Sequence, residues 1–120
     1  MPDPAVGAAA AALFTAAWAA ADRVASAAGA NTLYGRRLYG DLRAMGLRDV
    51  DAAGSLPILH GGTPGARFWR LTYTQYRERM VGTGLITEQD IEQLLALFDD
   101  PDFVWMHATL IAAWGRRADA

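Results

Sequence analysis

Residues 103–117 read FVWMHATLIAAWGRR, and this run is apolar almost throughout. Its residues 103–114 are rich in aromatic and β-branched side chains, and they lie between the two chain-breaking residues Pro101 and Gly115. A run of this kind is typical of a buried strand, although periodicity alone does not separate it from a buried helix. We expect residues 103–114 to form a strand; a purely helical bundle is the alternative.

A second strand is expected upstream, over residues 49–59. The helix before it should end at Gly46, because glycine readily adopts the left-handed conformation of a helix stop. Gly54 indicates a bulge within the strand, and Pro57 favours a position at the edge of a sheet. The expected inward-facing residues are Val50, Ala52, Leu56 and Ile58.

Four helices are expected around these strands, and their ends carry local signals. The expected helices run from Pro4 to the stop at Gly29, over residues 33–45, from Thr63 to Gly82 or Gly84, and from Thr87 to Asp99. Thr63 is followed by Pro64, the preferred pair for a cap and first helical residue. Thr87 and Asp90 have the spacing of a capping box, with Asp in place of Glu.

The composition bounds the fold and the chemistry. A chain of 120 residues is expected to form a single domain spanning residues 1–120. Alanine is abundant, so the four Trp, four Tyr and four Phe must supply much of the core volume. All 11 basic residues are Arg and there is no Cys, which excludes lysine and thiol chemistry within this chain.

Charge and hydropathy favour a cytoplasmic protein. The net charge of −2 gives no electrostatic footprint for nucleic acid or an anionic membrane, and we expect neither as a partner. Residues 4–21 carry no charge, but they are mostly Ala and lack the basic start of a signal peptide. They are therefore interpreted as a soluble alanine-rich helix.

The order of elements resembles the C-terminal half of class I S-adenosylmethionine-dependent methyltransferases. The residues that carry the resemblance are Gly46-Leu47-Arg48-Asp49-Val50 after a helix and the terminal Trp114-Gly115-Arg116-Arg117. The resemblance implies a partial Rossmann-like α/β fold, mostly helical, with a two-stranded antiparallel sheet. These would be the last two strands of the family fold, and residues 64–98 would be an insertion that helps to cover the substrate.

The segment that would hold the methyl donor is not found in these residues. The family binds the donor on an acidic-Gly-x-Gly-x-Gly loop after its first strand, at a helix N-terminus. Here the one G-x-G is Gly82-Thr83-Gly84, which follows a helix and is interpreted as its stop. We therefore expect no cofactor in this chain alone, and S-adenosylmethionine only if an N-terminal half completes the fold. With two His and no Cys, no metal site is expected.

This resemblance also predicts a partner. The last strand would lack one of its neighbours, and an unpaired apolar strand edge is a template for association. We expect a homodimer or a partner chain that supplies the rest of the sheet.

The third helix carries the candidate site. One stripe contains aromatic residues and the next contains arginines, which suggests a pocket for a flat or carboxylated small molecule. The candidate substrate-binding residues are Arg67, Trp69, Arg70, Tyr73, Tyr76 and Arg77. The simpler interpretation is a core face beside a solvated face. His60, on a loop before this helix, is the candidate proton acceptor, with a loop histidine of no function as its alternative.

Two functions remain open at this point. One is the substrate-binding portion of a small-molecule methyltransferase. The other is a non-enzymatic dimeric module that binds a ligand or another protein.

Overall fold

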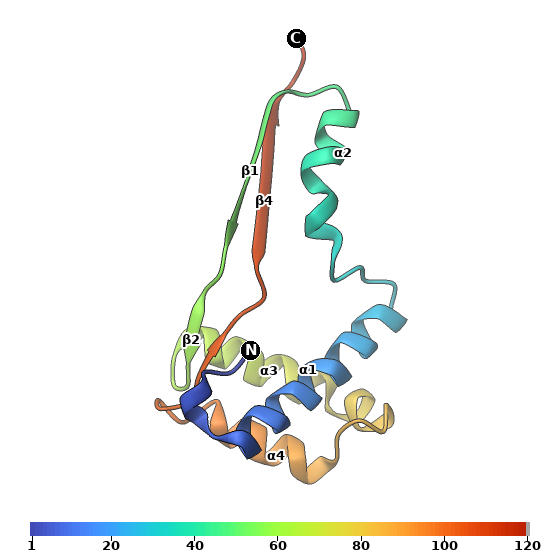
Figure 1. The fold of residues 1–120 in the computed structure, drawn as a ribbon. Helices are drawn as coiled ribbons and strands as arrows, with labels where there is room; N and C mark the ends of the chain where they lie inside the picture. The colour runs from blue at the N-terminus through green and yellow to red at the C-terminus, as the bar shows by residue number, and fades with distance from the viewer. Residues whose placement is uncertain (120) are drawn as a thin grey trace.

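A computed structural model describes residues 1–119, and the chain is elongated, with extents of 55 × 29 × 21 Å. At one end lies a helical body formed by α1 (Ala8–Ala27), α3 (Pro64–Gly82) and α4 (Glu88–Leu97). From it projects an arm formed by β1 (Arg48–Ser55), β4 (Leu110–Arg116) and α2 (Leu38–Ala44) (Figure 1). The mixed α/β class predicted from the sequence is confirmed.

Each of the two expected strands is divided into two. Residues 49–59 form β1 and the short β2 (Ile58–His60), and residues 103–114 form β3 (Val104–Met106) and most of β4. β1 pairs with β4 and β2 pairs with β3, both antiparallel. The expected antiparallel pair is therefore present, and the helical alternative for residues 103–114 is wrong. Continuity fails at Pro57, which has no N–H for a ladder; its carbonyl instead accepts a hydrogen bond from His107 N at 2.9 Å.

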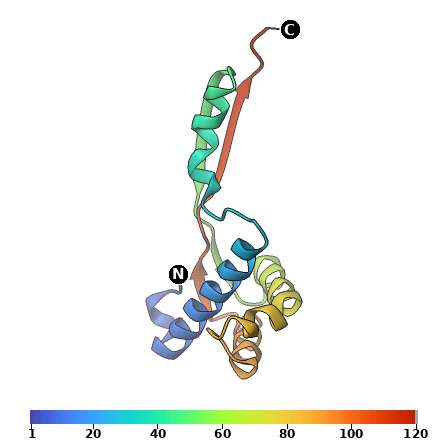
Figure 2. The ribbon, with the colours of Figure 1, turned by 90° about the vertical axis from the view of Figure 1, so that its right-hand side faces the viewer.

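The arm has one covered face. Side chains alternate across a strand, and the half-buried Val50, Ala52 and Ala113 lie on the face covered by α2 (Figure 2). The opposite face carries Leu110 and Trp114, which are 53% and 51% exposed.

The expected features of β1 are corrected in two ways. Gly54 pairs with Ile111 in regular register, and the irregularity lies between Arg48 and Asp51 instead. A Cβ at Gly54 would lie 3.2 Å from the Ile111 side chain, so this glycine serves close packing and not a bulge. Leu56 and Ile58, expected to face inward, are 50% and 58% exposed, because they lie where the chain passes from the arm to the body.

The core lies in the helical body, and its three largest fully buried side chains are aromatic: Trp105, Tyr73 and Phe98. Trp105 from β3 is 1% exposed, and its ring centroid lies 5.2 Å from that of Phe98 and 5.4 Å from that of Phe103. Ala17 and Ala66 are fully buried, so α1 and α3 approach closely through methyl groups. Aromatic residues thus supply the largest side chains of the core.

The helix starts were predicted correctly where a capping side chain specifies them. Thr63 caps α3, and Thr87 and Asp90 form a reciprocal capping box at α4. Asp3, however, caps only a 3₁₀ turn, and α1 begins after Gly7. The expected helix over residues 33–45 divides into a 3₁₀ turn (Tyr34–Arg37) and α2. Across the described residues, the helices all fall short of the length and hydropathy needed to cross a membrane.

Candidate functional site

A groove of about 520 Å³ runs between α1 and α3. Its aromatic lining residues are Trp18, Phe68, Trp69 and Tyr76. Alanines of α1 form much of the rest, and Leu33 and Ala108 contribute from the connecting segments. The volume falls within the range of small-molecule sites, roughly 300–1,000 Å³.

The aromatic rings are held against one another. The ring centroids of Trp18 and Trp69 lie 5.3 Å apart with an interplanar angle of 49°. Phe68 meets Trp69 edge-on, at 5.2 Å and 90°. Such pairs are favourable arrangements of aromatic quadrupoles, so they fix the ring positions before any ligand arrives. Phe68 is nevertheless 61% exposed and presents apolar surface to the groove.

Asp22 is the one ionisable acid or base among the groove residues other than Tyr76. It lies one helical turn after Trp18 and is exposed. Among the described residues it makes no ion pair; the ion pairs involve other carboxylates. The groove therefore combines an aromatic wall with a single negative charge.

His107 lies beside the groove. Its ring centroid is 5.3 Å from that of Trp69 and 6.3 Å from that of Trp18. Its Nδ1 is 2.8 Å from the carbonyl oxygen of Ala108. Because a carbonyl only accepts, Nδ1 carries the proton in this hydrogen bond and Nε2 remains an acceptor in the neutral ring. His107 lines a neighbouring hollow of about 320 Å³, whereas His60 lines neither this hollow nor the groove.

The predicted aromatic residues divide between the groove and the core. Trp69 and Tyr76 line the groove. Tyr73 is 1% exposed, its ring packs 5.7 Å from that of Phe98, and burial raises the pKa of its hydroxyl. Tyr73 therefore belongs to the core and not to the groove, as the simpler interpretation of this helix face predicts.

The predicted arginines lie away from the groove. Arg70 Nε lies 3.2 Å from Asp99 Oδ2. These two residues line a hollow near the start of α3, and Arg67 lines it as well. Arg77 contacts Glu88 and also Glu92, whose Oε1 lies 2.5 Å from its Nη2. Hydrogen bonds to these two carboxylates raise the pKa of Arg77. Arg67 and Arg70 therefore share a hollow of about 460 Å³ at the start of α3, whereas Arg77 pairs with α4 and lines neither this hollow nor the groove.

His60 is also separate from the groove. It ends β2, pairs with Val104, and is exposed. Its Nδ1 lies 3.3 Å from the carbonyl oxygen of Gly61, and it does not line the groove. His60 therefore does not lie with the described residues of the groove, and its role as a proton acceptor stays a prediction without geometric support.

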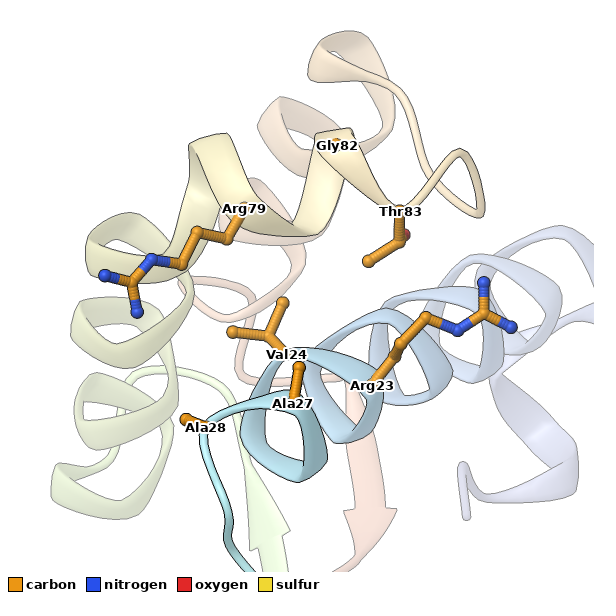
Figure 3. Close-up of a pocket in the computed structure, with 7 residues that line it drawn as sticks. All are labelled: Arg23, Val24, Ala27, Ala28, Arg79, Gly82 and Thr83. Atoms are coloured by element: carbon orange, nitrogen blue, oxygen red, sulfur yellow. The ribbon is translucent and has the colours of Figure 1, made fainter.

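One hollow outside the groove lacks the features of an anion-binding site. This hollow, of about 470 Å³, lies where the C-terminal ends of α1 and α3 meet, with Arg23 and Arg79 at its rim (Figure 3). The two guanidinium groups point away from each other, so they do not form an anion clamp. Within residues 1–119, no group of three His, Cys, Asp or Glu side chains could hold a metal ion.

Sequence reasoning missed Trp18, Asp22 and His107. Trp18 and Asp22 are spaced i, i+4 in an otherwise alanine-rich helix, which places them on one face. That spacing was a usable signal, since few other side chains of α1 are large or charged. No family model, curated protein or solved structure matches the chain.

Proposed function

We propose that this chain is the substrate-binding, C-terminal portion of a small-molecule S-adenosylmethionine-dependent methyltransferase. The observation that carries the proposal is the arrangement of the arm: β1 and β4 pair antiparallel, α3 and α4 are inserted between them in the chain, and β4 has one open edge. This order agrees with the one that the resemblance implies for the last two strands.

The described residues do not fit the methyl donor itself. Gly82-Thr83-Gly84 lies at the C-terminal end of α3, where Gly84 has a φ of +76°. A donor site of the family's kind needs a glycine-rich loop leading into a helix N-terminus. We therefore assign this chain the binding and orientation of the methyl acceptor, and no step that involves the donor. Holding the acceptor in one orientation is a large part of catalysis in transfer reactions.

The two edges of the arm differ, and the difference supports a partner along β4. The outer edge of β1 carries a register irregularity, Asp49 with a φ of +50°, and the charges of Arg48 and Asp51. These are features by which proteins protect an exposed edge. β4 carries none of them between Leu110 and Gly115. Its outer edge makes no backbone hydrogen bond to another described element.

β3 provides an internal comparison. It pairs with β2 on one side. On the other side, Asp3 N donates a hydrogen bond to the carbonyl of Val104, and Met106 N donates one to the carbonyl of Met1. Both of its edges are satisfied within one chain. In β4 only one edge is satisfied, so we propose that a strand of a second polypeptide pairs with the other. Two copies of this chain or a cofactor-binding half would each supply such a strand.

We expect the chain alone to show no saturable heat of binding with S-adenosylhomocysteine in calorimetry. Native mass spectrometry of the protein isolated from its own cells is expected to show a bound polypeptide with an acidic-Gly-x-Gly-x-Gly loop, and that complex should bind S-adenosylhomocysteine. Saturable binding to the isolated chain would contradict the assignment of the donor site to another polypeptide.

The second candidate is a non-enzymatic dimeric module. The groove favours it, because its lining comes from one chain and needs no cofactor half. Native mass spectra that contain only copies of this chain, with no cofactor binding, would support this alternative over the methyltransferase.

We expect Ala112→Lys to abolish association through β4. Ala112 lies on the uncovered face of the strand, and a charge at an edge strand opposes pairing. Ala53→Lys is the matched control, because Ala53 is the cross-strand partner of Ala112 on β1. Light scattering after size exclusion should show loss of the complex for the first variant and its retention for the second. A wild-type chain that is monomeric and without a partner at high micromolar concentration would contradict the proposal.

A further inference from the structure

We propose that the groove between α1 and α3 binds a flat organic cation, which lies against the rings of Trp18, Phe68 and Trp69 with the carboxylate of Asp22 as its counter-charge. This inference deepens the proposed function by naming a substrate class. The role of the ligand as a methyl acceptor rests on the proposed function, whereas the binding of the ligand does not.

The aromatic wall suits a cation. Trp18 comes from α1 and Trp69 from α3, and their rings pack against each other with centroids 5.3 Å apart, so they form one continuous aromatic surface of the groove. A cation near the face of an aromatic ring is attracted by its quadrupole, and tryptophan gives the strongest interaction. Phe68 adds a third ring that already stands edge-on to Trp69 and is 61% exposed. A flat ligand gains both apolar contact and this electrostatic attraction.

The sign of the charge in the groove decides between ligand classes. The sequence suggested a flat or carboxylated substrate held by arginines. Arg70 instead pairs with Asp99, and Arg77 pairs with the acidic residues of α4. The charged lining residue that remains is Asp22, which has no ion-pair partner among the described residues. A carboxylate ligand would meet a like charge there, whereas an amine or quaternary ammonium would be attracted.

The space in the groove depends on small residues. Ala21 and Ala25 lie on the same face of α1 as Trp18, and together with Ala108 they leave the volume open. Larger side chains at these three positions would occupy the space of the groove. The site therefore has room for a bicyclic aromatic ligand.

The test uses three flat probes of similar size: 1-methylquinolinium as the cation, 2-naphthol as a neutral compound and 2-naphthoate as the anion. Calorimetry and quenching of tryptophan fluorescence follow binding to the full chain without cofactor. We expect saturable binding of the cation, at least tenfold tighter than that of the anion. Equal or tighter binding of 2-naphthoate, or no saturation by 1-methylquinolinium in the low millimolar range, overturns the proposal.

Variants locate the site. Asp22→Asn is expected to weaken binding of the cation about three- to fivefold, in keeping with an exposed charge pair, and to leave 2-naphthol binding unchanged. Phe68→Ala should weaken binding of both compounds. Glu78→Gln removes an exposed carboxylate of α3 that does not line the groove, so it controls for net charge and should change nothing. An equal effect of Asp22→Asn and Glu78→Gln on cation binding overturns the assignment of Asp22.

This result is independent of the methyltransferase proposal. Cation binding by the isolated chain, together with no cofactor-binding partner, would support the groove and reject the enzyme. A partner that binds S-adenosylhomocysteine, together with no cation binding, would support the enzyme and reject the ligand class.

Discussion

Replacing Gly61 with Ala is expected to destabilise the fold by roughly 3 kcal/mol or more, which would leave little of the native state of a chain this size. A Cβ at this position would lie 1.9 Å from the carbonyl oxygen of Asp100 and 2.5 Å from its carbonyl carbon. Both are backbone atoms, so no side chain can rotate away. One of the two segments must move to accept the methyl group.

Movement at Gly61 is opposed by hydrogen bonds on both sides. Gly61 N donates to the carbonyl of Phe103 at 3.0 Å, and Gly62 N donates to that of Phe98 at 2.9 Å. These bonds join the β2–α3 turn to the segment between α4 and β3. A shift of the turn would therefore lengthen both bonds and disturb the aromatic core around Phe98, which is 2% exposed.

Urea denaturation followed by circular dichroism measures the effect. Gly40→Ala is the control: Gly40 lies inside α2, and its Cβ position meets nothing within 4 Å. Because glycine is unfavourable within a helix by about 1 kcal/mol, this second change should stabilise the chain slightly or leave it unchanged. A free energy of unfolding for Gly61→Ala within about 1 kcal/mol of the original would show that the turn is not held as described.

Much of the fold could be predicted because its signals are local. Thr63 before Pro64, and Thr87 three residues before Asp90, specify two helix starts through their own side chains. The divisions between β1 and β2, and between β3 and β4, could not be predicted in the same way. They depend on how the arm leaves the body, where Pro57 meets His107, a contact between residues far apart in the chain.

The candidate site was predicted only in part, for a geometric reason. At about 100° per residue, Tyr73 points roughly 40° away from Trp69 and 60° away from Tyr76. That difference is enough to place Tyr73 in the core and the other two in the groove. Arg77 was expected at a pocket, but the two acids that bind it belong to α4, and the sequence of a single helix does not reveal its neighbour.

Trp105→Ala is expected to reduce stability strongly and Trp114→Ala to leave it nearly unchanged, although both tryptophans lie in strands of the same C-terminal run. Trp105 is 1% exposed and packs against Phe14, with a centroid distance of 6.0 Å, as well as against Phe98 and Phe103. Its removal should cost about 3–5 kcal/mol through lost burial and the cavity left behind. The variant should unfold at much lower urea concentration or fail to fold.

Trp114 is 51% exposed on the uncovered face of β4, opposite Asp51. Its replacement should change the free energy of unfolding of the isolated chain by no more than about 0.5 kcal/mol, as for an ordinary surface position. The same variant should weaken association with a partner along β4, because a tryptophan buried at an interface contributes strongly to binding. Denaturation and light scattering on the two variants separate these effects. Loss of stability in Trp114→Ala, with association unchanged, would mean that Trp114 belongs to the core of a single chain and that β4 needs no partner.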